Sequence, residues 1–239
     1  VNDAPVATVG LSGTTAEDQN VVINLLASDV DDDVLTFTVE NPSNGSIIVD
    51  GSIATYTPNQ DFNGADSFTF TVSDGELDDT ATVTLTIDPV NDAPVLATVS
   101  DVDFDEDTST IISVSASDVD GDDLTFSITG GSEIIATLDG SDITFTPSEN
   151  FNGSETFTVT TTDSQLTDAQ DITVTVNAVN DPPVATTGLS GTTNEDQSIV
   201  INLSGSDIDG DALTFNADTP SNGSITIDGN IATYTPNQD

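Results

Sequence analysis

The chain contains no lysine, arginine, histidine, cysteine, methionine or tryptophan among its 239 residues. Without cysteine there is no disulfide, no thiolate metal site and no cysteine nucleophile. Without basic residues there is no Ser-His-Asp triad and no phosphate clamp. Nucleic acid and anionic membrane surfaces are also excluded as partners, because both are bound through Lys and Arg. No run of about 18 apolar residues is present that would insert into a membrane.

The chain is instead rich in acidic residues. It has 43 Asp and Glu residues and a net charge of -43, which nothing in the chain neutralises. We therefore expect cations as partners. High charge with few aromatics is also typical of disordered chains. Here, however, the apolar residues are phased, as in LTFTV from Leu35 and FTFTV from Phe68, and this alternation predicts strands with one buried face.

An internal repeat organises the whole sequence. The hexapeptide VNDAPV opens the chain, returns at Val90 and returns again as VNDPPV at Val179. The acidic loops ASDVDDD, ASDVDGD and GSDIDGD keep the same interval. The repeat predicts domains at residues 1–89, 90–178 and 179–239, the last without counterparts of residues 62–89. We expect the chain to continue beyond Asp239, with any export signal or anchor outside this segment.

Each repeat is predicted to be an antiparallel β-sandwich of about seven strands. In the first repeat we expect strands at residues 6–11, 20–27, 34–40, 46–50, 53–57, 66–73 and 80–87. Asp50-Gly51 is a two-residue hairpin signal and Asn44-Gly45 marks another turn. The linker DPVNDAPV is short and holds two prolines, so it is expected to resist free swivelling.

The acidic residues gather in loops, and this placement indicates calcium. Clusters of Asp, Asn and Glu offer the hard oxygen ligands that Ca²⁺ prefers, whereas zinc and copper sites need His or Cys. Two other calcium motifs fit poorly: the DxDGD loops lack the helices of an EF-hand, and they do not recur every nine residues. Acids that serve only solubility or edge protection would be scattered. They would not keep Asp-x-Asp at one place in every copy.

The succession VNDAPV, Glu17, ASDVDDD, TVSDG and TLTIDPVNDAP resembles a cadherin-type domain. It is most similar to the bacterial cadherin-like tandem repeats of large extracellular adhesins and biofilm matrix proteins, and the resemblance covers essentially the whole chain. It implies an all-β fold, a tandem array of Ig-like or cadherin-like Greek-key sandwiches forming an extended rod. It also implies a bacterial cell-surface location and calcium ions between consecutive domains.

The same resemblance implies two sets of metal ligands. Those of the first junction are Glu17, Asp88, Asn91, Asp92, Asp118, Asp120 and Asp163. Those of the second are Glu106, Asn180, Asp181, Asp207 and Asp209. The family's Asp-Arg-Glu element is absent, and its place is taken by Asp61 and Asn63 in the first repeat and by Asn150 and Asn152 in the second. Asn177 replaces the acid corresponding to Asp88, so we expect fewer or more weakly held ions. Asp66 and Glu155 are either further ligands or structural caps.

These observations predict a calcium-binding, calcium-rigidified repeat region of a surface or matrix-fibre protein. Without metal the clustered carboxylates repel, and with calcium they clamp neighbouring domains. Three alternatives stay open: a glycan- or cell-binding module, a fibre of associating identical chains, and an acidic spacer without a specific metal site. Sugar sites usually offer aromatic platforms, and the only tyrosines are Tyr56 and Tyr234. Catalysis is not expected, because a carboxylate pair for glycoside hydrolysis would recur in every copy.

Overall fold

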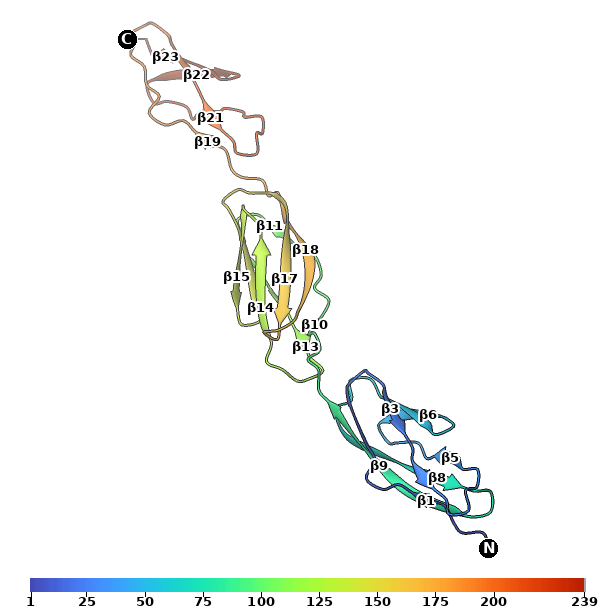
Figure 1. Cartoon of the computed structure of the whole chain (residues 1–239). Coiled ribbons are helices and arrows are strands. Elements are labelled where there is room, and N and C mark those ends of the chain that lie inside the picture. Colours follow the sequence, from blue (N-terminus) through green and yellow to red (C-terminus); the bar gives the residue numbers. More distant parts are fainter. Residues whose placement is uncertain (239) are drawn as a thin grey trace. The chain divides into compact units, whose positions relative to one another are not determined.

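The computed structural model describes residues 1–238. Every regular element among them is a β-strand, and none forms a helix that could cross a membrane (Figure 1). The chain divides into two compact units. The first unit holds residues Val1–Val95, Ala116–Thr125 and Thr162–Asp168, and the second holds the rest. The first unit therefore contains the whole first repeat, the linker after it and two loop regions of the second repeat.

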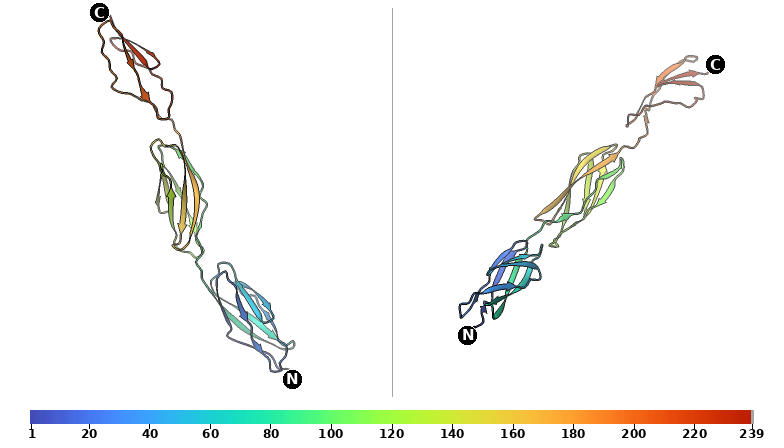
Figure 2. Two further views of the ribbon diagram at one scale, coloured as in Figure 1. Left: turned by 45° about the horizontal axis from the view of Figure 1, so that its top comes forward. Right: turned by 90° about the vertical axis from the view of Figure 1, so that its right-hand side faces the viewer.

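The first repeat is a sandwich of a four-stranded and a three-stranded sheet (blue to green in Figure 2). The larger sheet has the order β2 (Ser12–Ala16), β9 (Asp78–Asp88), β8 (Gly64–Ser73), β5 (Thr36–Val39). The smaller has the order β3 (Val21–Asn24), β7 (Ile53–Pro58), β6 (Gly45–Asp50). A short pair joins β1 (Val6–Ala7) to β4 (Ala27–Ser28).

Alternation along the strands builds the core between these sheets. On β8 the side chains of Phe68, Phe70 and Val72 are buried, while the threonines between them lie on the outer face. On β9 the alternate residues Ala81, Val83, Leu85 and Ile87 are buried in the same way. Successive side chains of a strand point to opposite faces, so this pattern gives one apolar and one hydroxyl-rich face per sheet. The predicted all-β sandwich is therefore confirmed.

The prediction was wrong about the first strand and about its pairing. Only Val6–Ala7 of the expected strand at 6–11 pairs, and a strand that we did not predict follows at Ser12–Ala16. Its sequence SGTTA carries no apolar alternation, so the pattern gave no signal. Gly10 lies between the two pieces with φ 78, a value that glycine adopts without strain. Strand β2 then pairs in parallel with β9, from Ser12 opposite Thr84 to Ala16 opposite Asp88.

The expected strand at 20–27 is divided into β3, which pairs with β7, and β4, which pairs with β1, so this prediction was wrong. The remaining strands were close to prediction. The two longest, β8 and β9, extend two residues beyond their expected starts, because β-pairing continues from Gly64 opposite Ile87 to Ser73 opposite Asp78. The hairpin between β6 and β7 falls at the predicted place. Its two loop residues are Gly51 and Ser52, which lie between the predicted strands 46–50 and 53–57, and Asp50 of the Asp50-Gly51 signal pairs with Ile53.

The second repeat has the same two sheets. The larger has the order β11 (Val102–Asp105), β18 (Thr167–Asn177), β17 (Gly153–Thr162), β14 (Thr125–Gly130), and the arrows of β14, β17 and β18 run side by side in Figure 1. The smaller has the order β12 (Thr110–Ser113), β16 (Asp142–Pro147), β15 (Ile134–Asp139). A short pair joins β10 (Val95–Leu96) to β13 (Ala116–Ser117). Phe145 and Phe157 meet edge to face in the core, with ring centroids 5.1 Å apart.

Among the described residues of the third repeat, 179–238, the smaller sheet is formed, with the order β20 (Ile199–Asn202), β23 (Ile231–Pro236), β22 (Gly223–Asp228). It lies beside a short pair of β19 (Val184–Ala185) and β21 (Gly205–Ser206). The described residues at 190–194 and 214–217, which correspond to β2 and β5, are not in strands. In the first repeat β2 pairs with β9 and β5 with β8, and residues 179–239 include no counterpart of β8 or β9.

Thr161 is an exception in the core of the second repeat. It occupies the position of Val72 in the first repeat, both side chains are fully buried, and the Thr161 hydroxyl has no hydrogen-bond partner. An unpartnered buried hydroxyl destabilises the fold. We expect Thr161→Val to raise the free energy of unfolding of the second repeat by about 1–2 kcal/mol, measured by urea denaturation. The exposed change Thr156→Val is the control, and equal effects of the two would contradict this account.

Glu155 is a structural cap. Its carboxylate accepts hydrogen bonds from the backbone of Ser132, Glu133 and Ile134, at 2.9–3.1 Å, and from the Ser132 hydroxyl at 2.7 Å. Asp66 takes the same position in the first repeat, where it accepts bonds from the Asn44 backbone at 3.0 Å and from the Tyr56 hydroxyl at 2.9 Å. Both acids hold the turn before the first strand of a hairpin, so the capping alternative applies.

The cap makes the stability of the second repeat dependent on pH. Partial burial raises the pKa of Glu155. The hydrogen bonds from Ser132, Glu133 and Ile134 lower it by more than burial raises it, so that the pKa falls from 4.5 to about 2. A depressed folded-state pKa stabilises the fold above pH 4.5, and this contribution is lost as the pH falls toward 2. We expect wild type to lose about 1 kcal/mol more than Glu155→Gln over this interval, allowing for solvent screening. Glu149→Gln is the exposed control in the same denaturant titration.

Candidate metal centre at the junction of repeats

Glu17 follows the last residue of β2 and is buried, with 3% of its surface exposed. Because β2 and β9 are parallel, both end at the same edge of the sandwich, where β9 runs into the linker. The Glu17 amide donates to the Asp88 carbonyl at 3.0 Å, and its carboxylate accepts from the Val90 amide. The other carboxylate oxygen of Glu17 lies 3.5 Å from the amide nitrogen of Asn63. The tertiary fold thus fixes one carboxylate against the linker.

The linker is also bound to the loop after β13. The Asp92 amide donates to the carboxylate of Asp120 at 2.8 Å, and the Asp120 amide donates to Asp118 at 2.9 Å. Asn91 donates its side-chain amide to Asp163 at 2.7 Å, and Asp163 is only 6% exposed. This hydrogen bond, with those from the amides of residues 165 and 166, lowers the pKa of Asp163. All of these residues belong to the first compact unit.

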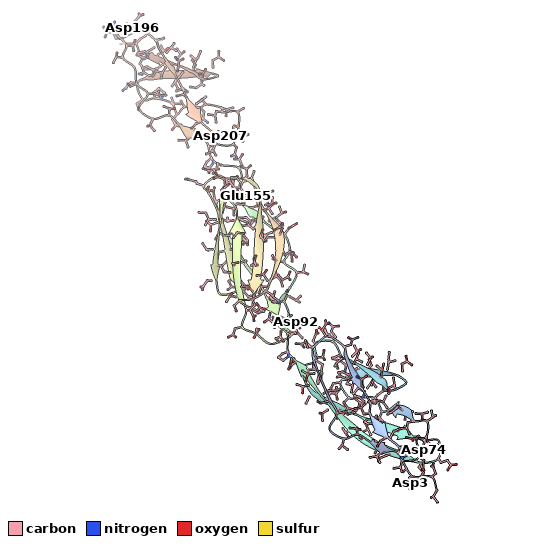
Figure 3. The ribbon with its side chains drawn as sticks, in the orientation of Figure 1. Asp3, Asp74, Asp92, Glu155, Asp196 and Asp207 are labelled. Atoms are coloured by element: carbon pink, nitrogen blue, oxygen red, sulfur yellow. The ribbon has the colours of Figure 1, made fainter. Side chains whose placement is uncertain are left out.

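The carboxylates converge around Asp92, which Figure 3 labels in the linker. Oxygens of Glu17, Asp92 and Asp120 lie within 4.8 Å of one another, and so do those of Asp18, Asp61 and Asp92. Burial, followed by the charges of Asp61, Asp120, Glu17 and Asp18, raises the pKa of Asp92. The chain has no Lys, Arg or His to offset this charge. The cluster therefore favours uptake of a proton or of a metal cation.

Some oxygens of this cluster have no hydrogen-bond partner. One carboxylate oxygen of Asp92 and one of Asp118 are buried without a hydrogen-bond partner. Buried polar atoms are normally paired, so these oxygens are available as ligands of a cation. The donor set consists only of carboxylate, amide and carbonyl oxygens, which suits a hard cation that takes six to eight oxygen ligands, as Ca²⁺ does. The residues at this junction thus fit calcium.

The second junction, within the second unit, repeats the hydrogen bonds of Glu17 and of the linker, but among the described residues its carboxylates form no group within 4.8 Å like those of the first junction. Glu106 is 3% exposed, accepts from the Val179 amide at 2.6 Å, and lies 3.4 Å from the amide nitrogen of Asn152. The Asp181 amide donates to Asp209 at 2.7 Å, and the Asp209 amide donates to Asp207 at 3.1 Å. One oxygen of Asp181 is again buried and unpartnered.

The linker acid of the second junction is perturbed in the same direction as Asp92. Burial first, then the charges of Asp107, Asp209, Glu106 and Asp207, raise the pKa of Asp181. The side-chain amide of Asn180 donates to the carbonyl of Asp181 at 3.0 Å, as Asn91 does to Asp92. Both junctions therefore place a linker carboxylate among other acids.

Some predicted ligands take other places than their motif implied. The side chain of Asp88 is exposed, and it is the backbone carbonyl of this residue that contacts Glu17. Asn150 lies beside Asp107, to which its amide donates at 3.1 Å. The Asp61 amide donates to Asp18 in the same manner, at 3.2 Å, but the carboxylate of Asp61 stays in the junction cluster with Asp18 and Asp92.

Two groups of residues were missed at the sequence level. Asp18 joins the cluster at the first junction although its motif had been assigned to Glu17 alone. At the N-terminal end of the first repeat, Asn2 donates to Asp74 at 2.9 Å and the Asp3 amide to Asp31 at 2.8 Å. Asp3 and Asp74 are labelled near each other in Figure 3. These residues and the carboxylate group of Asp29, Asp31 and Asp33 correspond to the residues that the linker and the second repeat place at the first junction. The repeat interval would have located them.

Comparisons with known proteins agree with this fold. The model of a family described as bacterial Ig domain matches residues 2–86, 91–175 and 180–239. Chitinase A of Pseudoalteromonas piscicida is 35% identical over 132 residues, which is 53% of this chain but only 16% of that relative's length. The chain therefore spans a small part of this relative.

A solved cadherin structure has the same fold. Human protocadherin-24 EC1-2 superimposes with a TM-score of 0.50 at 16% identity, over 74% of this chain and 100% of that one. An endo-fucoidan hydrolase from glycoside hydrolase family 107 has a TM-score of 0.34 at 23% identity, over 74% of this chain and 29% of that one. Ig-like and cadherin-like repeats are typically extracellular, adhesive or structural, and non-catalytic. Since its family model matches nearly the whole sequence, the chain belongs to the bacterial Ig domain family, as tandem repeats of a cadherin-like sandwich.

Proposed function

We propose that the chain is a calcium-binding region of a bacterial surface or matrix protein, in which calcium stiffens the junctions between consecutive repeats. The observation that carries the proposal is the first junction. There the buried Glu17, the linker residue Asp92 and the loop residue Asp120 bring carboxylate oxygens within 4.8 Å. No basic side chain exists to neutralise them.

Each part of the junction would contribute ligands to one ion. Glu17 belongs to the first repeat, Asp92 to the linker, and Asp118 and Asp120 to the second repeat. Calcium would supply the positive charge that these groups lack. Without it their repulsion opposes the close approach of the two repeats. A ligand that binds only the ordered junction also raises the stability of the adjoining folds by linkage.

A mechanical role in adhesion follows from these properties. Repeats joined by calcium-stiffened linkers give a protein reach and resistance to bending outside the cell. Associating identical chains or surface glycans would be partners of such an array. The array lacks the His, Cys and Lys side chains of most activated nucleophiles.

The chitinase relative favours a second candidate. Its 35% identity over 132 residues suggests that repeats of this kind also act as spacers within longer polysaccharide-degrading enzymes. Reading the coding sequence on both sides of this segment distinguishes the two: a catalytic domain on either side supports a spacer, and further repeats support a surface or matrix protein.

Small-angle X-ray scattering tests the proposed function directly. The chain is measured in calcium, in chelator and in magnesium at equal ionic strength. We expect the maximum dimension to rise with calcium to that of a straight array and to remain lower in chelator and in magnesium, because Mg²⁺ demands a smaller and stricter octahedral site. A profile that is the same in all three buffers would overturn the proposal and leave the acids as a solubility device.

A further inference from the structure

Strand β6 (Gly45–Asp50) is an open edge of the smaller sheet of the first repeat. The order of that sheet is β3, β7, β6, so β6 is paired on one side only, and Figure 1 shows it at the margin of the repeat. It has six residues, whereas the other edge strands of the two sheets, β2, β3 and β5, have five, four and four. The longest unpaired edge of this repeat is therefore β6.

The open side of β6 presents backbone groups that can pair with another strand. Asp50 and Ile53 flank a two-residue turn, and the first and fourth residues of such a turn share a hydrogen bond. Hydrogen-bonded and non-hydrogen-bonded pairs alternate along an antiparallel ladder. Ile48 therefore bonds to β7, while Ile47 and Val49 direct their N–H and C=O groups outward. Among the described residues none hydrogen-bonds these outward groups.

The features that normally protect such an edge are missing from β6. Natural edge strands carry lysine, proline, a bulge or an inward-pointing charge. The sequence GSIIVD has no lysine or proline, and its pairing with β7 runs without a bulge from Gly45 opposite Pro58 to Asp50 opposite Ile53. Its single charge is Asp50, at the last position. In a chain with a net charge of -43, this edge is almost uncharged.

The side chains of β6 suit an added strand on both faces of the sheet. Ile47 and Val49 point inward and are only partly buried against the core. Ile48 points outward with 74% of its surface exposed, in one row with Thr55 of β7 and Val22 of β3. A further strand would cover the core residues on one face and extend this row on the other.

We propose that β6 pairs in antiparallel fashion with β6 of a second copy of this chain, joining two three-stranded sheets into one of six strands. A two-fold axis at Ile48 places Ile47 opposite Val49 of the other copy, and their outward backbone groups meet. Asp50 then lies opposite the uncharged Ser46. A parallel pairing would instead set the two Asp50 carboxylates side by side, and like charges directly opposite each other are destabilising.

Charge favours this occupant at this place. The chain has no basic side chain, so two copies have no opposite charges through which to bind. Their contact has to use a segment with little charge, as β6 is. The acids elsewhere still repel, and salt that shortens the Debye length to about 3 Å at 1 M removes most of this repulsion. The contact is therefore expected to strengthen as ionic strength rises.

The same edge recurs in the other repeats. The counterparts β15 (Ile134–Asp139) and β22 (Gly223–Asp228) also have six residues, one paired side and an aspartate at the last position. Thr137 and Thr226 take the place of Ile48, and paired threonines also stabilise a sheet. Several weak contacts along one array add to a stronger one. This lateral contact goes beyond the proposed function and does not depend on calcium at the junctions.

Cross-linking through a single introduced cysteine tests the pairing. The chain has no cysteine, and Cβ atoms of directly opposed residues lie about 4.5–5.5 Å apart. The full-length Ile48→Cys variant is incubated in chelator and 1 M NaCl with oxidised glutathione, which takes up the two electrons and two protons of the thiols. We expect covalent dimer at least about tenfold faster than with Val22→Cys. Val22 is the control because it is 58% exposed on the same face, but on the opposite edge strand.

Sedimentation velocity measures the same contact without a covalent bond. In chelator and 1 M NaCl the apparent mass of wild type is expected to rise with protein concentration. Ile48→Asp is expected to weaken this association at least about tenfold, because it sets two like charges opposite each other. Val22→Asp adds the same charge at the opposite edge and should associate as wild type does. Urea denaturation of both variants checks that each is folded.

The outcomes distinguish edge pairing from other contacts and from the proposed function. Equal cross-linking rates at the two cysteine positions, or a wild type that stays monomeric at every concentration, would refute the pairing. Association that Val22→Asp weakens as much as Ile48→Asp would indicate contact through the sheet face and would also refute it. Because these measurements are made in chelator, their failure leaves calcium-stiffened junctions standing, and a scattering profile indifferent to calcium leaves the edge pairing standing.

Discussion

Replacing Asp118 and Asp120 together by alanine is expected to abolish the part of the calcium-dependent rise in the chain's maximum dimension that comes from the first junction. The Asp120 carboxylate accepts a hydrogen bond from the Asp92 amide and belongs to the carboxylate group with Glu17. The Asp118 carboxylate accepts a hydrogen bond from the Asp120 amide and has a buried oxygen without a partner. Replacing both removes the ligands that the acidic loop of the second repeat would give to the ion. We expect calcium affinity at this junction to fall at least about 100-fold, or roughly 2.8 kcal/mol.

The measurement is small-angle scattering of the variant in calcium and in chelator. Its control is Asp103→Ala with Glu133→Ala, which removes the same charge from exposed positions of the same repeat. The control should extend with calcium as wild type does. If the Asp118 and Asp120 variant extended equally, the loop would not hold the ion and the proposed junction would be refuted.

Glu17→Gln is expected to change stability in opposite directions with and without calcium. Glu17 is buried beside Asp92 and Asp120, and the chain has no basic side chain to offset their charge. In chelator the neutral amide removes a buried charge and its repulsion, so we expect the free energy of unfolding to rise by about 1 kcal/mol. In calcium the variant lacks a ligand and should lose most of the stabilisation by linkage, about 2.7 kcal/mol at 100 times the dissociation constant.

Urea denaturation of wild type and variant in both buffers measures this reversal. The exposed change Glu40→Gln is the control and should have the same small effect in both. A Glu17→Gln variant that is stabilised equally in calcium and in chelator would show that Glu17 is not a ligand. Destabilisation in both buffers would instead assign it a purely structural role, through the hydrogen bond from Val90.

Much about this protein follows from local chemistry. The alternation of Thr with Phe and Val determined which faces are buried, because successive side chains of a strand point to opposite sides. The recurrence of VNDAPV determined the tandem organisation. The absence of His, Cys, Lys and Arg excluded whole classes of chemistry. None of these conclusions depends on which strand pairs with which.

The arrangement of the candidate site was decided by tertiary pairing. Strand β2 has a weak sequence signal, and its parallel pairing with β9 rests on contacts between residues some 70 positions apart in the sequence, such as Ser12 and Thr84. That pairing places Glu17 at the end of the sandwich where the linker begins. An antiparallel β2 would have carried it to the opposite end. The turns at Asp18 and Asp61 then add the carboxylates that no motif had assigned together. The sequence by itself determined that this chain is an acidic array of β-sandwiches. Only the tertiary structure decided which acids meet, because long-range backbone pairing, and not residue type, brings the ends of distant strands together.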